Sequence, residues 1–336
     1  MTGPAPEPLI SVIVPFKNEA LTLPLLLDSL AIQEADFSWE VIFSDGCSTD
    51  KSVEIIRQHP LSKKVSVSVL PLPPENHGMT VARNAAARVA KGKYLLFMQA
   101  DLRINDPKAL AKTRQCLETP GVVGTTFVQF GADAEFSSYN FWGQVFQARH
   151  VGTRVPAAFD TKFNAVPREL FEKMNGFDEQ HYAWGGEDFD FLVRLRVYGQ
   201  LKDTGVEVEH LHGLGKPFSA MGTLKKYCRN SECMGITTPN YWRHRDVERW
   251  FPLFLAKQLL VCATAISTLN PFWWPWTILL LFVMGIWWNK AAFLRVRNWR
   301  LIWLPFYSLA AMYCFTFYFL RGLILGRSLY KFDNKM

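Results

Sequence analysis

Two long apolar segments without a charged residue lie in the last quarter of the chain. They cover Pro271–Trp288, which is 18 residues long, and residues 301–320. A helix needs about 17–25 mostly apolar residues to cross the hydrocarbon core of a bilayer, so each segment is long enough to do so. Tryptophans stand at the ends of both segments, where aromatic side chains meet lipid head groups. We therefore predict membrane helices here, although two buried helices of a soluble core are the alternative.

A third apolar segment, residues 252–269, contains Lys257 and Gln258, so it fits either a tilted span or a helix at the membrane surface. Basic residues cluster after Trp288 and again near the C-terminus, and such clusters favour the cytoplasmic side. They are Lys290, Arg295, Arg297 and Arg300, and then Arg321, Arg327, Lys331 and Lys335. One crossing between the clusters cannot place both in the cytoplasm, so the sequence leaves the number and orientation of crossings open.

Charge and cysteine usage indicate where the rest of the chain lies. The 37 Lys and Arg exceed the 30 Asp and Glu, giving a net charge of +7, but no Lys/Arg-rich block is present. This pattern favours an anionic membrane surface over a nucleic acid as the partner. The six cysteines form no CxxC pair, which argues against a disulfide framework and against a zinc ribbon. Residues 1–8 lack the basic and apolar regions of a signal peptide, so we expect the chain to start in the cytoplasm. We expect a multi-pass membrane protein whose catalytic domain faces the cytoplasm.

Short apolar runs alternate with amphipathic stretches before Arg249, where the composition changes. The runs at residues 10–16, 40–44, 65–70 and 94–98 are typical of buried strands. The stretches at residues 21–33, 48–58, 81–90 and 107–117 are typical of helices that cover a sheet. The predicted fold class is α/β, with a mostly parallel sheet flanked by helices and followed by membrane helices. We expect one domain over residues 1–248 and a membrane-associated helical region over residues 249–336.

The loops that follow the predicted strands carry the polar residues of interest, because ligands bind beyond the carboxyl ends of parallel strands. Asp101 follows the fourth strand, and two glycines precede Glu187 and Asp188. Residues 206–212 read as a strand that ends in His210 and His212. Carboxylate oxygens combined with imidazole nitrogen suit Mn²⁺ or Mg²⁺ better than zinc. Each residue alone also fits an ordinary turn, helix cap or structural histidine.

Together these motifs resemble the family 2 inverting glycosyltransferases of the GT-A fold over residues 10–234. The resemblance rests on SVIVPFKNE, SDGCSTD, ARNAAARVAKGKYLLFMQAD and NGFDEQHYAWGGEDFDF, and the last of these also resembles a galactosyltransferase segment. It implies transfer of a sugar from a nucleotide-sugar donor. It also implies Mn²⁺ or Mg²⁺ as cofactor.

The resemblance assigns roles to individual positions. The implied nucleotide-binding residues are Pro15, Asn18, Glu19, Asp45, Arg83 and Arg229. The implied metal ligands are Asp101 and His210, with His212 as the nearby alternative. Gln99 stands where the family has the first Asp of its Asp-x-Asp metal motif, which puts the affinity and choice of metal in doubt.

The segment around Gly185 carries the implied catalytic and acceptor positions. Asp188 matches the general base, and Glu187 matches a neighbour that contacts acceptor or donor sugar. Trp184 would form the floor of the acceptor site beside Gly185 and Gly186. The implied acceptor is a hydroxyl group of a lipid-linked or cell-envelope glycan, and we expect a UDP-sugar as donor. Transfer to a polyprenyl phosphate, a processive polymer synthase and a non-catalytic nucleotide-sugar sensor are the alternatives.

Overall fold

The computed structural model describes residues 7–75, 78–131, 133–157, 159–182, 185–215, 217–243, 250–267 and 269–326. The chain forms two compact units. Among the described residues, the first unit contains residues 7–131 and 152–214, and the second contains residues 133–151 and 215–326. The predicted end of the transferase domain at residue 248 was placed where the composition of the sequence changes, not where one compact unit ends. It stays a prediction.

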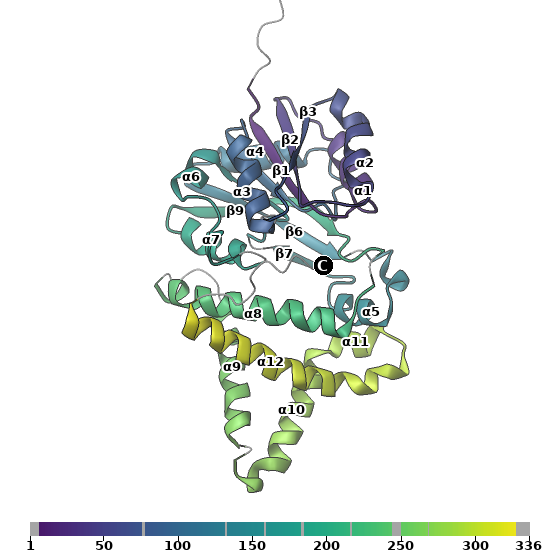
Figure 1. Ribbon diagram of the computed structural model, residues 1–336, viewed down its shortest axis with the longest axis vertical. Helices are drawn as coiled ribbons and strands as arrows, with labels where there is room; N and C mark the ends of the chain where they lie inside the picture. The colour runs from purple at the N-terminus through teal and green to yellow at the C-terminus, as the bar shows by residue number, and fades with distance from the viewer. Residues whose placement is uncertain are drawn as a thin grey trace, which may run out of the picture. The chain divides into compact units, whose positions relative to one another are not determined.

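The first unit is built on a five-stranded sheet in the order β3-β2-β1-β4-β8. Figure 1 labels three of its strands, β1, β2 and β3. All neighbouring strands are parallel except β4 and β8, which are antiparallel. Side chains along β1, β2 and β4 are buried, as expected for the inner strands of a sheet covered on both faces. The strands are β1 (Ile10–Phe16), β2 (Trp39–Asp45), β3 (Ser66–Pro71), β4 (Tyr94–Met98) and β8 (Phe163–Pro167). The predicted mostly parallel sheet is confirmed.

A second sheet of four strands completes this unit, in the order β5-β9-β6-β7. The strands are β5 (Leu102–Arg103), β6 (Val122–Gly131), β7 (Arg154–Ala157) and β9 (Gln200–His210). β6 and β9 run parallel to each other, whereas β5 pairs antiparallel with the end of β9. This antiparallel pairing brings the residues after β4 next to the residues at the end of β9.

Helices pack on these sheets. They are α1 (Leu23–Ala31), α2 (Ser52–Gln58), α3 (Met79–Val89), α4 (Ala109–Leu117), α6 (Arg168–Lys173) and α7 (Glu187–Leu195), with a 3₁₀ turn η1 (Pro60–Lys63). Helices α1 to α4 occur where the amphipathic stretches were predicted, whereas α6 and α7 were not predicted from the sequence. α3 packs against β1 and β2, and α4 packs against β6 and β9. Apolar residues of α1, such as Leu26 and Leu27, join β1 and β2 in the core of the unit.

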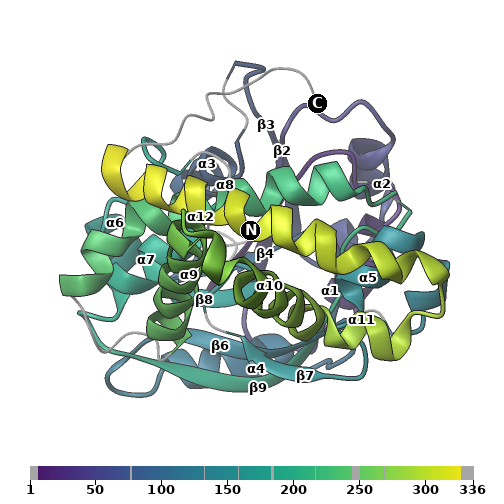
Figure 2. The same cartoon turned by 90° about the horizontal axis from the view of Figure 1, so that it is seen from below.

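The second unit is helical. Its elements are η2 (Phe136–Ser138), α5 (Phe141–Gln147), α8 (Ala220–Arg243), α9 (Trp250–Ser267), η3 (Pro271–Trp273), α10 (Trp274–Trp288), α11 (Lys290–Arg295), η4 (Trp299–Trp303) and α12 (Leu304–Leu325). α8 and α12 lie side by side, and α9 and α10 form a hairpin that projects away from them (Figures 1 and 2).

The contact between α8 and α12 depends on two glycines. A Cβ atom at Gly235 would lie 2.1 Å from the Phe319 carbonyl oxygen, and one at Gly322 would lie 2.1 Å from the Glu232 carbonyl oxygen. Only glycine therefore permits this close approach of the two backbones. An ion pair between Glu232 and Arg321 lies at the same crossing, and Glu232 is fully buried.

Two segments of this unit are long and apolar enough to cross a membrane, judged by length and composition among the described residues. They are Pro271–Trp288 and Trp299–Leu325, and Pro252–Ser267 is a shorter apolar helix. Only 17% of the first segment is buried. These helices match the apolar segments found in the sequence, and their crossing of a membrane stays a prediction.

Candidate active site

Asp101, His210 and His212 lie close together where β5 pairs with the end of β9. Leu102 pairs with His210 across β5 and β9, and the Leu211 N–H donates a hydrogen bond to the Asp101 carbonyl at 2.8 Å. This register places Asp101 between two histidines that are more than a hundred residues further along the chain. His210 Nε2 lies 3.3 Å and His212 Nδ1 lies 3.4 Å from Asp101 Oδ2.

The donor set of this cluster fits a divalent cation. One carboxylate oxygen and two imidazole nitrogens all lie within 4.8 Å of one another. Burial alone raises the pKa of Asp101, but His210 and His212 outweigh it and hold that pKa well below its usual range. The carboxylate is therefore ionised at neutral pH, as a metal ligand has to be. The structure thus brings together the three residues predicted as ligands.

Glu187 and Asp188 begin helix α7, after the two glycines. Gly186 adopts φ 88° and Gly185 adopts φ 156°, both outside the range that other residues favour. The turn they make starts the helix abruptly, so both carboxylates lie in its first turn. The partial positive charge at a helix N-terminus stabilises negative charge there.

The Asp188 carboxyl group in this turn has a raised pKa. Burial raises the pKa of Asp188 to about 7, with further contributions from the charges of Glu187 and Asp160. A carboxyl group with a pKa near neutrality is suited to accept a proton. Asp160, between β7 and β8, was missed in the sequence because it belongs to no motif, and it forms an ion pair with Lys162.

Arg83 lies in the interior of the unit, where it forms an ion pair with Glu187. Its Nη1 donates a hydrogen bond to Glu187 Oε1, and the two side chains are 2% and 5% exposed. Nearby on the same face of α3, Thr80 Oγ1 donates to the Tyr182 carbonyl, and Asn84 exchanges hydrogen bonds with the Phe177 backbone. The polar face of α3 therefore holds the segment that leads into α7. The predicted contact of Arg83 with a nucleotide stays a prediction.

The loops after β1 and β2 are tied to each other. Asn18, with φ 55°, donates its N–H to Ser48 Oγ at 3.0 Å, and its Oδ1 accepts from the Thr49 N–H at 2.8 Å. Asp45 Oδ1 accepts from the Ser48 N–H at 2.9 Å. The parallel register of β1 and β2 sets Phe16 opposite Asp45, which brings the two loops to the same edge of the sheet.

The other predicted nucleotide-binding residues have different surroundings. Pro15 is buried within β1, opposite Ser44. The Glu19 N–H donates to Ser52 Oγ at 2.9 Å, and its carboxylate accepts from Thr22 Oγ1 at 3.0 Å. Arg229 belongs to α8 in the second unit. Trp184, predicted as the acceptor floor, lies outside the described residues.

Comparison with protein families finds two matches, which together span most of the first unit. Residues 11–174 match the family model described as glycosyl transferase family 2. Residues 11–174 form a glycosyltransferase family 2 domain. The match spans both loops and ends just before the segment held by α3. Residues 163–216 match a model described as the N-terminal domain of galactosyltransferase, and they contain α7, β9 and both histidines.

Relatives in sequence are also named as glycosyltransferases. An uncharacterized glycosyltransferase of Haemophilus influenzae is 29% identical over 197 residues, which cover 56% of this chain and 62% of the relative. TarS of Staphylococcus aureus, a poly(ribitol-phosphate) beta-N-acetylglucosaminyltransferase, is 35% identical over 96 residues, or 28% of this chain and 16% of TarS. The chain thus aligns with less than two thirds of the length of either relative.

Solved structures share the GT-A-type fold of the family 2 domain. The mannosyltransferase PcManGT of Pyrobaculum calidifontis, in complex with GDP-Man and Mn²⁺, has a TM-score of 0.56 at 17% identity. The match covers 96% of this chain and 88% of PcManGT. TarS residues 1–349 in complex with UDP-GlcNAc have a TM-score of 0.50 at 18% identity, covering 96% of this chain and 93% of that one. These likenesses confirm the predicted fold.

Proposed function

We propose that this chain is an inverting glycosyltransferase that moves a sugar from a nucleotide-sugar donor to a hydroxyl group of a cell-envelope or lipid-linked glycan at a membrane. The family 2 domain supports sugar transfer from an activated donor. The relative TarS is named for transfer to poly(ribitol-phosphate), which supports an envelope glycan as the acceptor class. The two apolar helical segments support a location at a membrane.

The observation that carries the proposal is the environment of Asp188. Its carboxyl group lies in the first turn of α7 with a pKa raised to about 7 by burial and by neighbouring negative charges. A base with a pKa near the working pH takes up a proton efficiently and is still ionised in a large share of molecules. A carboxylate in water, with a pKa near 4, would be a weaker base for a sugar hydroxyl.

The reaction then has a simple balance of bonds. Asp188 takes the proton of the acceptor hydroxyl, and the hydroxyl oxygen forms a bond to the anomeric carbon. The bond between that carbon and the diphosphate oxygen breaks, and the nucleoside diphosphate leaves. The attack comes from the face opposite the leaving group, so the configuration at the anomeric carbon inverts. The ion pair with Arg83 fixes the position of Glu187 beside Asp188.

Asp101, His210 and His212 would hold the divalent cation, for which we propose Mn²⁺ or Mg²⁺. When bound, such an ion neutralises negative charge on the diphosphate. The loops that contain Pro15, Asn18 and Asp45 are proposed to bind the nucleoside, which we expect to be uridine. Glu19, Arg83 and Arg229 are the further proposed donor contacts, and Trp184, Gly185 and Gly186 those of the acceptor.

The test is release of nucleoside diphosphate by membranes that contain the full chain. UDP- and GDP-sugars are supplied in turn with Mn²⁺, Mg²⁺ or EDTA, and extracted envelope lipid serves as acceptor. We expect release from one donor class that needs both metal and acceptor. Asp188→Asn should lower the rate by about 10²–10⁴-fold, the usual contribution of a general base.

Asp203→Asn is the matched control, because Asp203 is an exposed carboxylate on β9 of the same unit. It should leave the rate unchanged. If release persisted in Asp188→Asn but still required lipid, the acceptor would be an already ionised polyprenyl phosphate, and the hydroxyl acceptor would be rejected. Nucleotide binding without release from any donor would reject the enzyme and favour a nucleotide-sugar sensor.

A further inference from the structure

A large apolar cavity lies inside the helical unit. Its volume is about 480 Å³, within the range of roughly 300–1,000 Å³ that ligand pockets usually have. Helices α8, α9, α10 and α12 all contribute to its wall. Three methionines line it, namely Met234, Met284 and Met312. Flexible thioether side chains of this kind adapt to hydrocarbon ligands of varied shape.

The wall of the cavity contains several polar side chains and one charged side chain. Thr316 Oγ1 donates a hydrogen bond to Gln258 Oε1 at 2.6 Å, so these two side chains are paired with each other. Lys257 is the only charged residue among the lining residues. Its Nζ lies 5.4 Å and 4.9 Å from the ring centroids of Trp287 and Trp288. Within the part of the chain that the structure describes, no carboxylate forms an ion pair with Lys257.

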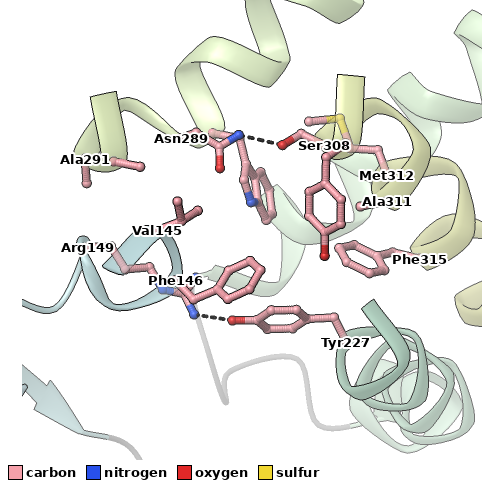
Figure 3. A pocket seen from close by; sticks show the side chains of 13 residues that line it. Val145, Phe146, Arg149, Tyr227, Asn289, Ala291, Ser308, Ala311, Met312 and Phe315 are labelled. Atoms are coloured by element: carbon pink, nitrogen blue, oxygen red, sulfur yellow. Dashed lines mark hydrogen bonds between the residues drawn. The ribbon is translucent and has the colours of Figure 1, made fainter. Parts of the chain in front are cut away.

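A second cavity next to it, which shares Tyr227, Trp288 and Met312 in its wall, is too small for such a ligand. It measures about 70 Å³. Its polar side chains pair with each other, as Figure 3 shows: Asn289 donates to Ser308, and Arg149 donates to Tyr227 at 3.0 Å. The larger cavity therefore carries the ligand argument.

The exposed side chains on the outer faces of α9 and α10 indicate what surrounds the large cavity. Large apolar side chains on this hairpin are exposed, and among them are Leu259, Ile266, Phe272, Trp276, Ile278 and Val283. An apolar surface of this extent is stable in the hydrocarbon of a bilayer rather than in water. Lys257 beside two tryptophans is the arrangement found at the level of lipid head groups, where cations meet phosphate.

We propose that this cavity binds one anionic phospholipid of the bilayer, with a hydrocarbon chain in the cavity and the head-group phosphate against Lys257. The proposal goes beyond sugar transfer, because none of the lining residues belongs to the candidate active site. Because the wall is adaptable, the length and saturation of the lipid's hydrocarbon chain should affect binding little. Lys257 recognises the negative charge of the head group. The basic residues Lys290, Arg295 and Arg297 add to the attraction of anionic lipid.

The experiment is native mass spectrometry of the full chain in detergent, with phosphatidylglycerol, phosphatidylcholine or a polyprenyl phosphate added. We expect one saturable phosphatidylglycerol adduct that is retained better than phosphatidylcholine. Lys257→Gln should weaken phosphatidylglycerol binding at least about tenfold, because a charge-assisted contact with a lipid of net negative charge is lost. It should weaken phosphatidylcholine binding less, because the choline group offsets the charge of the phosphate. Met284→Trp places a larger side chain in the wall of the cavity and should weaken the phosphatidylglycerol adduct.

Leu259→Trp is the matched control for Met284→Trp, because Leu259 is 70% exposed on the outside of the same hairpin. It should retain the adduct, whereas loss in both variants would identify lipid bound around the hairpin and overturn the cavity site. Equal retention of the two phospholipids, with no effect of Lys257→Gln, would also overturn the proposal. Displacement of phosphatidylglycerol by equimolar polyprenyl phosphate would assign the cavity to a polyprenyl lipid instead.

Discussion

Arg83 and Glu187 form a buried ion pair that links α3 to the first turn of α7, across 104 residues of sequence. The carboxylate of Glu187 lies next to Asp188 in the chain and is one of the charges that raise the pKa of Asp188. The pair therefore does two things. It fixes the start of α7, and it holds Glu187 beside the proposed base, where the charge of Arg83 partly offsets the rise in the pKa of Asp188.

Removing the arginine should destabilise the protein more than removing an exposed one. Arg83→Met leaves Glu187 buried without its partner, which costs about 3–5 kcal/mol of unfolding free energy for a pair of this kind. Arg83→Lys keeps the charge and should recover part of the loss. Arg88→Met is the control, because Arg88 is 66% exposed and its pair with Glu179 should contribute less than about 1 kcal/mol. Urea unfolding of the full chain in detergent measures all three, and equal losses for Arg83→Met and Arg88→Met would contradict the role of the buried pair.

The pH dependence of transfer should report Asp188. Because the base has to be ionised and its pKa is raised to about 7, kcat/KM should rise with pH through about 7 and level off above it. Glu187→Gln removes a neighbouring negative charge, so the midpoint should move to lower pH. A rate profile that is flat between pH 5 and 8 would show that another group accepts the proton.

Stability should change with pH in the opposite sense to activity. The pKa of Asp188 is higher in the folded chain than its unfolded value near 4, so the folded state binds more protons between pH 4 and 7. Stability from this group is therefore complete at low pH and is lost as the pH rises to about 7. Asp188→Asn avoids the loss and should raise the melting temperature at pH 8 by at least about 2 °C, with no gain at pH 4. A melting temperature that drops in this variant at pH 8 would contradict the raised pKa.

Metal affinity should depend on the histidines at the end of β9. His210→Ala removes a nitrogen 3.3 Å from Asp101 Oδ2, and Mn²⁺ binding should weaken by at least the ~10–100-fold seen when only an outer partner of a ligand is lost. His181→Ala is the control, since His181 pairs with Asp178 in another loop and should bind Mn²⁺ as the wild type does. Titration calorimetry with Mn²⁺ alone separates this effect from activity. Unchanged affinity in His210→Ala would reject the proposed centre.

The sequence predicted the elements whose signals are local. β1, β2 and β4 are continuous apolar runs between polar loops, and all three occur where they were expected. Asp101, His210 and His212 could be singled out because each follows or ends a predicted strand. The antiparallel register of β5 and β9, which brings them together, has no signature in a strand of two residues.

Features that depend on contacts between residues far apart in the chain could not be predicted from the sequence. The resemblance assigned Arg83 to the nucleotide, and this role stays a prediction. Nothing in the sequence around Arg83 shows that the polar face of α3 is buried against Tyr182 and Glu187. Asp160 has no motif, and its effect on Asp188 arises only from the fold. Gly235 and Gly322 look like ordinary helix-weakening residues until α8 and α12 are seen to cross there.

The measurement that tests the central claim most directly is the anomeric configuration of the product. Once nucleotide release has identified a donor, the product is isolated and its glycosidic linkage is determined by nuclear magnetic resonance. A single displacement with Asp188 as base predicts a linkage opposite in configuration to that of the donor. A product with the donor's configuration would require two displacements or a front-side attack, and would contradict the assignment of Asp188.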